Sequence, residues 1–136
     1  MTRTMRVRDA RPEDLPVMQA IAAENGIEGY ELPWGGAWGA IALLDEQPVA
    51  FITGRDISQG LFAEDLWAVG GQDGIRGIAK LNEWLEETAE AVARKEGKPI
   101  MIGAAVRLGN TAQLNTMLSG RGYQPYAVVL AKRIAP

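Results

Sequence analysis

The pattern of apolar and polar residues along the chain predicts a regular series of strands and helices. Strands are indicated where apolar residues alternate with polar ones or form short runs between turn residues, over 5–10, 38–44, 49–55, 61–69, 99–106 and 126–133. Helices are indicated where apolar residues recur every three or four positions, from Pro12 to the Asn25-Gly26 stop, from Gly74 to the Gly97 cap, and over about 111–119.

This order of elements, β-α-β-β-β-α-β-α-β, predicts a mixed sheet with helices packed on it. A short turn separates strands 38–44 and 49–55, so these two are expected to form an antiparallel hairpin. The fold class is α/β of the α+β type, with a mostly antiparallel sheet of about six strands flanked by three to four helices. We expect residues 1–136 to form a single domain, because no repeat or linker interrupts the pattern.

Composition narrows the chemistry that is possible. The 136 residues are 47% hydrophobic, which is enough for a packed core. The absence of cysteine and histidine excludes thiolate nucleophiles, imidazole bases and metal sites built from those ligands, and no metal is expected. The net charge of −3 argues against a nucleic-acid partner, and the lack of a long apolar run argues against a membrane and for a cytoplasmic protein.

The glycine-rich segment between strand 61–69 and the long helix is the strongest functional signal. It reads Val-Gly-Gly-Gln-Asp-Gly-Ile-Arg-Gly-Ile-Ala over 69–79. Glycines at a strand-to-helix turn leave backbone N–H groups free and let a ligand approach the main chain, and the helix N-terminus adds partial positive charge. The segment therefore predicts a site for a phosphate-bearing ligand. The alternative is that the glycines serve only the turn.

In this segment and in its element order, the chain resembles the GNAT superfamily of acyl-CoA-dependent N-acetyltransferases. The family signature, Val-x-Pro-x-x-(Arg/Gln)-Gly-x-Gly-x-(Gly/Ala), is matched at Val69, at Arg76 in a commonly basic place, at Gly77 and at Ala79. Gly122-Tyr123 looks like the family's Gly-Phe pair before the last strand. The resemblance implies acetyl-CoA as the cosubstrate, bound by Trp67, Ala68, Val69, Gly74, Ile75, Arg76, Gly77, Ile78, Ala79 and Asn110.

The resemblance also implies how these residues would contact the cosubstrate. Amides from about 74–79 would hold the CoA pyrophosphate, and the strand that ends at Val69 would pair with the pantetheine arm. A backbone N–H near Ala68 or Val69 would polarise the thioester oxygen. Asn110 resembles the asparagine that begins the preceding helix in the family and contacts the cofactor.

Direct attack by an amine needs a proton acceptor, and the chain offers three candidate carboxylates. Asp65 is the first, because it alternates onto the same strand face as Trp67. Glu64 points to the opposite face if the strand is regular, but a β-bulge would reverse the choice. Glu31 lies in the irregular segment 27–36, which in the family borders the acceptor site. Each carboxylate has the alternative of being a solvated surface group.

Three positions depart from the family pattern and keep a second function open. Gly71 replaces the proline and Gly74 the arginine or glutamine, while Leu118 takes the place of the frequent catalytic tyrosine. Tyr30 and Tyr126 are the possible substitutes for that acid. The leading hypothesis is an N-acetyltransferase that acts on a primary amine of a small molecule or protein, and the resemblance implies a homodimer. The alternative is a degenerate CoA-binding or structural module, regulatory or from a phage or mobile element, without catalysis.

Overall fold

The computed structural model describes residues 3–31, 37–106, 111–126, 132 and 134–136, with the backbone alone for 111–113. The chain divides into two compact parts, Met1–Ala104 and Ala105–Pro136. Among the described residues, the first part contains the whole sheet together with helices α1 and α2, and the second contains helix α3.

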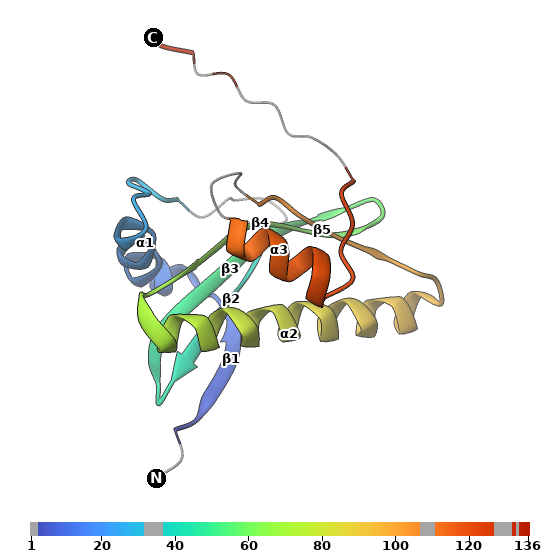
Figure 1. Cartoon of the computed structure of the whole chain (residues 1–136), viewed down its shortest axis with the longest axis horizontal. Helices are drawn as coiled ribbons and strands as arrows, with labels where there is room; N and C mark the ends of the chain where they lie inside the picture. The colour runs from blue at the N-terminus through green and yellow to red at the C-terminus, as the bar shows by residue number, and fades with distance from the viewer. Residues whose placement is uncertain (1–2, 32–36, 107–110, 127–131, 133) are drawn as a thin grey trace. The chain divides into compact units, whose positions relative to one another are not determined.

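The sheet of the first part has five strands in the order β1-β2-β3-β4-β5 (Figure 1). The strands are β1 (Met5–Asp9), β2 (Ala37–Leu44), β3 (Gln47–Ile57), β4 (Gly60–Ala68) and β5 (Met101–Ala104). Neighbours from β1 to β4 pair antiparallel, and β5 pairs parallel with β4. The predicted mixed, mostly antiparallel sheet is confirmed, whereas most of the sixth predicted strand, 126–133, lies outside the described residues.

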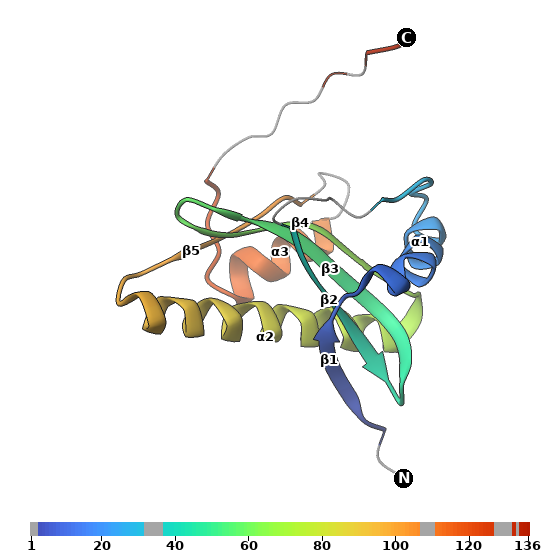
Figure 2. The same ribbon diagram turned by 180° about the vertical axis from the view of Figure 1, so that it is seen from behind.

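Helices pack on both faces of this sheet (Figure 1 and Figure 2). The short 3-10 turn η1 (Pro12–Asp14) leads into α1 (Leu15–Glu24), and α2 (Gly71–Glu96) follows β4. The side of the sheet under α1, here the α1 face, is a buried cluster of Met18, Ile21, Ala22, Tyr30, Ile41, Leu43 and Phe51. The opposite side, the α2 face, buries Leu81, Leu85 and Ala89 of α2 against residues that include Ala40, Ala42, Ala50 and Ile52.

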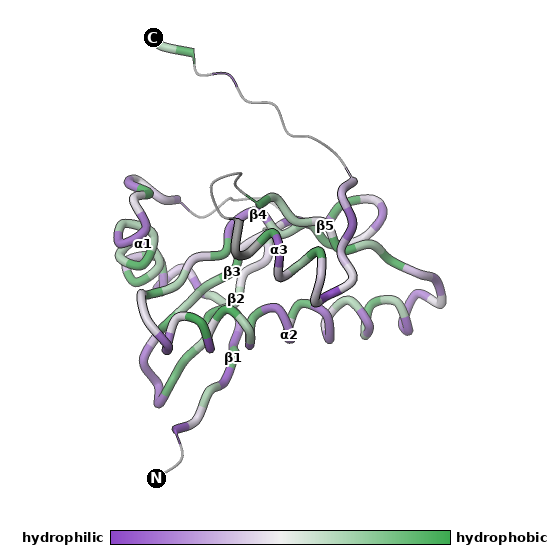
Figure 3. The backbone as a smooth tube through the Cα atoms, in the orientation of Figure 1, coloured by the Kyte–Doolittle hydropathy of each residue, from purple (hydrophilic) through white to green (hydrophobic). Residues whose placement is uncertain are grey.

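Helix α2 spans 26 residues, and its buried residues lie on the side of the helix that packs on the sheet. A glycine ends the helix. Hydrophilic and hydrophobic positions alternate along its turns in Figure 3. Trp84 packs against Trp38 of β2 with ring centroids 5.9 Å apart. Gly97 ends the helix with a φ of 66°, the left-handed conformation that favours glycine at this position.

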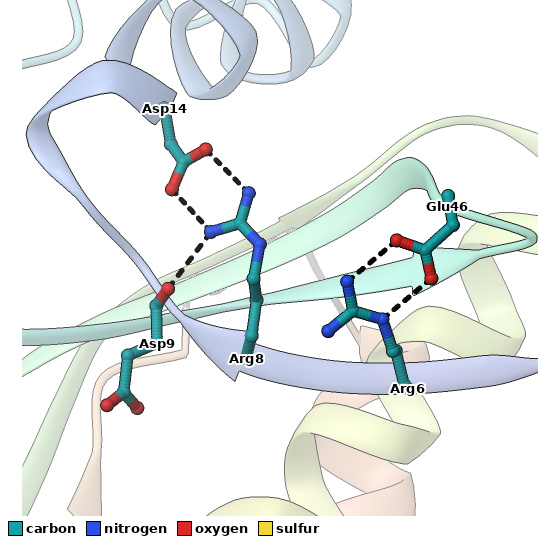
Figure 4. Close-up of polar contacts among 5 residues, drawn as sticks. All are labelled: Arg6, Arg8, Asp9, Asp14 and Glu46. Carbon is teal, nitrogen blue, oxygen red and sulfur yellow. Dashed lines mark hydrogen bonds and ion pairs between the residues drawn. The ribbon is translucent and has the colours of Figure 1, made fainter.

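Ion pairs fasten β1 to its neighbours, as Figure 4 shows. Both terminal nitrogens of Arg8 donate to Asp14, at 2.7 and 2.8 Å, and one of them also donates to the Asp9 carbonyl. The Arg8 guanidinium lowers the pKa of Asp14 below its ordinary value. Arg6 makes a second two-pronged pair with Glu46 in the β2–β3 turn. The first pair fixes the start of α1 on the sheet.

In the second part of the chain, α3 (Thr111–Gly120) has the predicted position and ends in a glycine turn. Gly122 has a φ of 76°, and the Tyr123 N–H donates to the Met117 carbonyl at 3.2 Å. Leu118, at the family's tyrosine position, is 39% exposed.

Candidate functional site

Strand β4 contains a β-bulge at Glu64. Pairing with β3 joins Asp65 to Thr53 and Ala63 to Gly54, so Glu64 is an additional residue with no opposite partner. An extra residue changes which side chains face each side of the sheet. Ala63 before the bulge and Leu66 after it both belong to the α2 face, although their numbers differ by three.

The bulge brings both candidate carboxylates of β4 to the α1 face. Asp65 accepts a hydrogen bond from the Trp67 Nε1 at 3.1 Å, which confirms that these two residues share a face. The Arg55 Nε lies 2.5 Å from the Glu64 Oε1, and Arg55 shares the α1 face with Thr53 two residues earlier on β3. The alternative that a bulge would turn Glu64 to this face is therefore realised, without turning Asp65 away.

A buried polar pair lies beside Asp65 on the neighbouring strand, because Thr53 is its opposite residue on β3. The Tyr30 hydroxyl and the Thr53 Oγ1 are 3.0 Å apart, and their residues are 7% and 1% exposed. Burial above all, together with the negative charges of Asp65 and Glu64, raises the pKa of Tyr30 to about 12, even though the hydrogen bond with Thr53 lowers it. A phenol with a raised pKa donates its proton less readily than an ordinary tyrosine does, so Tyr30 is a poor substitute for the missing acid.

Beyond the bulge, one edge of β4 has no partner strand among the described residues. Strand β5 pairs only with 60–63 of β4. The Val69 N–H donates to the Val49 carbonyl at 2.9 Å, and in an antiparallel pair the inward-pointing groups alternate. The N–H groups of Leu66 and Ala68 therefore point to the open edge. Ala68 remains a candidate to polarise a thioester oxygen, while the Val69 N–H is already used within the sheet.

Asn25 closes the end of this open edge. Its Nδ2 donates to the Ile21 carbonyl at 2.8 Å and to the Ala68 carbonyl at 2.9 Å. The side chain thus joins the last turn of α1 to the last residue of β4. In the described part of the chain, the groups without a partner on this edge are the N–H groups of Leu66 and Ala68 and the Leu66 carbonyl.

Helix α2 begins at Gly71, three residues before the predicted start. Gly70 is its N-cap, in an extended conformation with φ −66° and ψ 162°. The first four N–H groups of a helix have no intrahelical acceptor, and here they belong to 70–73. From Gly74 onward the amides lie inside the helix, so the amides free to meet a phosphate precede the predicted segment 74–79.

The two glycines that depart from the family signature explain this early start. Gly71 has a φ of 81°, which a proline cannot adopt. A Cβ atom on Gly74 would overlap the Val69 carbonyl oxygen, so no arginine or glutamine fits there. The helix therefore begins directly against the end of β4, in a tighter turn than the signature implies.

The other predicted cofactor residues take different positions on α2. Gly77 faces the sheet, where an added Cβ would lie 2.8 Å from the Ala50 Cβ, so it serves close packing of helix on sheet. Ile75 is 64% exposed, Arg76 and Ala79 are exposed, and Ile78 is half-buried. Glu31 is exposed beside Tyr30, and Asn110 lies outside the described residues.

Comparison with known proteins decides the fold. No family model and no curated protein sequence matches the chain. Among solved structures, a transcriptional regulator from Bacillus halodurans C-125 matches with a TM-score of 0.72 and 18% identity, over 96% of this chain and 100% of that one. An aminoglycoside acetyltransferase from an uncultured soil metagenomic sample matches with a TM-score of 0.66 and 14% identity, over 96% and 97%.

A third match, the aminoglycoside N-acetyltransferase AAC(6')-Iy in complex with CoA, has a TM-score of 0.65 and 11% identity, over 99% and 98%. The chain has the GNAT acetyltransferase fold. The site residues that the resemblance implies on β4 and at the start of α2 stay predictions, and Thr53 and Arg55, which contact Tyr30 and Glu64, were not among the predicted residues. Thr53 reaches Tyr30 through the loop after α1, and Arg55 reaches Glu64 through cross-strand pairing, and neither arrangement leaves a sequence signal.

No helix in the described part of this GNAT-fold chain is long and apolar enough to cross a membrane.

Proposed function

We propose that this chain is an acetyl-CoA-dependent N-acetyltransferase that acetylates the primary amine of a small molecule or protein by direct attack. The observation that carries the proposal is the open edge of β4 beyond the Glu64 bulge. It presents the N–H groups of Leu66 and Ala68 next to two carboxylates on the α1 face. An extended acyl-carrying chain can pair with such an edge as an additional strand.

The start of α2 supplies the second part of the proposed cosubstrate site. Its free N–H groups at 70–73 follow directly on the β4 edge, and helix N-termini favour phosphate groups. Two solved structures with the same fold support CoA as the bound molecule, since one contains CoA and another a bisubstrate analogue joined to CoA. The pyrophosphate would bind the N-terminus of α2 while the pantetheine arm follows β4 toward the bulge.

The residues at the bulge fit the chemistry of acyl transfer. The amine nitrogen forms a bond to the thioester carbonyl carbon, and the Ala68 N–H stabilises the negative charge on the oxygen. Asp65 takes the proton that the nitrogen loses, directly or through water. The carbon–sulfur bond then breaks, and the thiolate takes a proton from water because Leu118 offers none.

Release of the CoA thiol from acetyl-CoA in the presence of amines tests the proposal. We expect Asp65→Asn to lower turnover at neutral pH by about 100-fold, which is the usual contribution of a general base. Its dissociation constant for acetyl-CoA should stay close to that of the wild type. Full activity of Asp65→Asn would instead point to Glu64 or Glu31 as the base.

A CoA-binding module without catalysis is the second candidate. Leu118 at the tyrosine position and the likeness to a protein described as a transcriptional regulator favour it. Saturable binding of acetyl-CoA without thiol release across a broad set of amines would support this function over the enzyme.

A further inference from the structure

Arg55, Glu64 and Asp65 form a group of one positive and two negative charges on the α1 face. The Arg55 guanidinium pairs with Glu64, with the Nε and Oε1 2.5 Å apart. The hydrogen-bond donor to Asp65 is instead the neutral indole N–H of Trp67. Among the residues that the structure describes, one of the two adjacent carboxylates is thus paired with a full positive charge and the other with a dipole.

The strand register explains why Arg55 forms its ion pair with Glu64. Arg55 lies directly opposite Phe62 on β4, and Thr53 lies opposite Asp65. The extra residue of the bulge places Glu64 between these two pairs, within reach of the long arginine side chain. The Glu64 side chain is 28% exposed and that of Arg55 is 49% exposed, so the pair lies at the rim of the site.

We propose that Arg55 determines acceptor specificity by setting the charge of this group to −1. Within the described residues, two carboxylates and one guanidinium leave a single negative charge without a cationic partner, on Asp65, which fits an acceptor amine with one positive charge. Without Arg55 the group would carry −2 and attract polycations more strongly, since attraction grows with the product of the charges. This inference rests on the proposed function, because it assumes that the acceptor binds beside Asp65.

The chain offers a matched control for the loss of an arginine. Arg6 on β1 pairs with Glu46 at 2.7 Å through two hydrogen bonds, and its side chain is 48% exposed, close to the value for Arg55. Strand β1 lies at the other end of the sheet, with β2 and β3 between it and β4. Arg6→Gln therefore changes the net charge of the protein as Arg55→Gln does, but far from the bulge.

The experiment compares two acceptors of different charge, propylamine with one amino group and spermidine with three. The kcat/KM for thiol release from acetyl-CoA is measured for both with the wild type, Arg55→Gln, Arg55→Lys and Arg6→Gln. We expect the wild type to use propylamine at least as well as spermidine. Arg55→Gln should raise the spermidine-to-propylamine ratio of kcat/KM about tenfold at low salt. In 0.5 M salt this gain should shrink, because salt screens the attraction between exposed charges. Arg55→Lys should restore the wild-type ratio, and Arg6→Gln should leave it unchanged.

Several results would overturn this role for Arg55. A ratio that Arg55→Gln leaves unchanged, or that Arg6→Gln raises equally, would show that the pair does not control acceptor charge, while the proposed transferase activity would stand. A wild type that clearly prefers spermidine would also contradict it. A wild type that binds acetyl-CoA but acetylates neither amine would contradict both this inference and the proposed transfer to simple amines.

Discussion

Replacement of Tyr30 by phenylalanine tests the buried polar pair that Tyr30 forms with Thr53, the residue opposite Asp65. Tyr30→Phe removes only the hydroxyl, because the ring can keep its contact with Phe51, whose centroid is 5.1 Å away. The Thr53 Oγ1 would then lose its 3.0 Å partner at a position that is 1% exposed, where water cannot replace it. A buried hydroxyl without a partner lowers the free energy of unfolding by about 1–3 kcal/mol.

A double-mutant cycle gives this prediction its sharpest form. Thr53→Val keeps the shape of the side chain but leaves the Tyr30 hydroxyl unpaired, so it should cost about as much as Tyr30→Phe. Removing both hydroxyls together leaves no unpaired group, so Tyr30→Phe/Thr53→Val should be more stable than the sum of the two single changes predicts. We expect a coupling free energy of about 1–2 kcal/mol between the two sites.

Urea unfolding followed by circular dichroism measures these differences. Tyr126→Phe is the control, because Tyr126 is 76% exposed and its hydroxyl can bond to water. This variant should unfold as the wild type does, within about 0.5 kcal/mol. A Tyr30→Phe variant as stable as the control, or two single changes that simply add, would refute the claim that Tyr30 and Thr53 form a buried hydrogen bond.

Three further predictions follow from the same structure. Burial raises the pKa of Tyr30 to about 12 in the folded chain, against 10.0 unfolded, so the free energy of unfolding should fall as the pH rises from 10 to 12. Tyr30→Phe should lose part of this pH dependence, and a variant whose free energy of unfolding follows the same pH profile as that of the wild type would contradict the prediction. Gly74→Ala should lower the free energy of unfolding by about 2 kcal/mol or more in the same denaturation assay, because the added Cβ would overlap the Val69 carbonyl. Gly70→Ala is the control: a Cβ on Gly70 meets nothing within 4 Å, so this change should cost less than about 1 kcal/mol. Asp14→Asn should lower the free energy of unfolding at pH 7 by about 1–2 kcal/mol. Because Arg8 lowers the pKa of Asp14 in the folded chain, the wild type should lose this advantage over the variant as the pH falls below about 4. A difference between wild type and variant that is the same at pH 7 and below pH 4 would rule this out.

Hydrophobic periodicity was sufficient to predict the elements of the first part of the chain and their order. The hairpin of β2 and β3 and the parallel pairing of β4 with β5 follow from turn length and from the helix between them. Each element also has a strong local signal, as at Gly97, where the chain needs a left-handed residue to end α2. Turns, helix ends and strand patterns depend on residues that are close together in the chain, so a single sequence is enough to predict them.

The site was harder to predict because its geometry depends on pairing between distant strands. Whether Glu64 and Asp65 share a face is decided by the register with β3, and a bulge has no distinctive residue type here. The early start of α2 depends on how closely Gly74 approaches Val69. The pairs of Arg55 with Glu64 and Tyr30 with Thr53 likewise form only once the chain has folded.

Calorimetric titration of the purified protein with acetyl-CoA tests the central claim most directly, because every proposed step requires this molecule to bind. We expect saturable binding with one site per chain and a dissociation constant in the micromolar range, roughly −8 kcal/mol. The Gly74→Ala variant should bind more weakly, since the N–H groups at 70–73 would move with the start of α2. Failure of the folded wild type to bind either acetyl-CoA or CoA would contradict the proposed function and show that this chain uses the GNAT fold for another purpose.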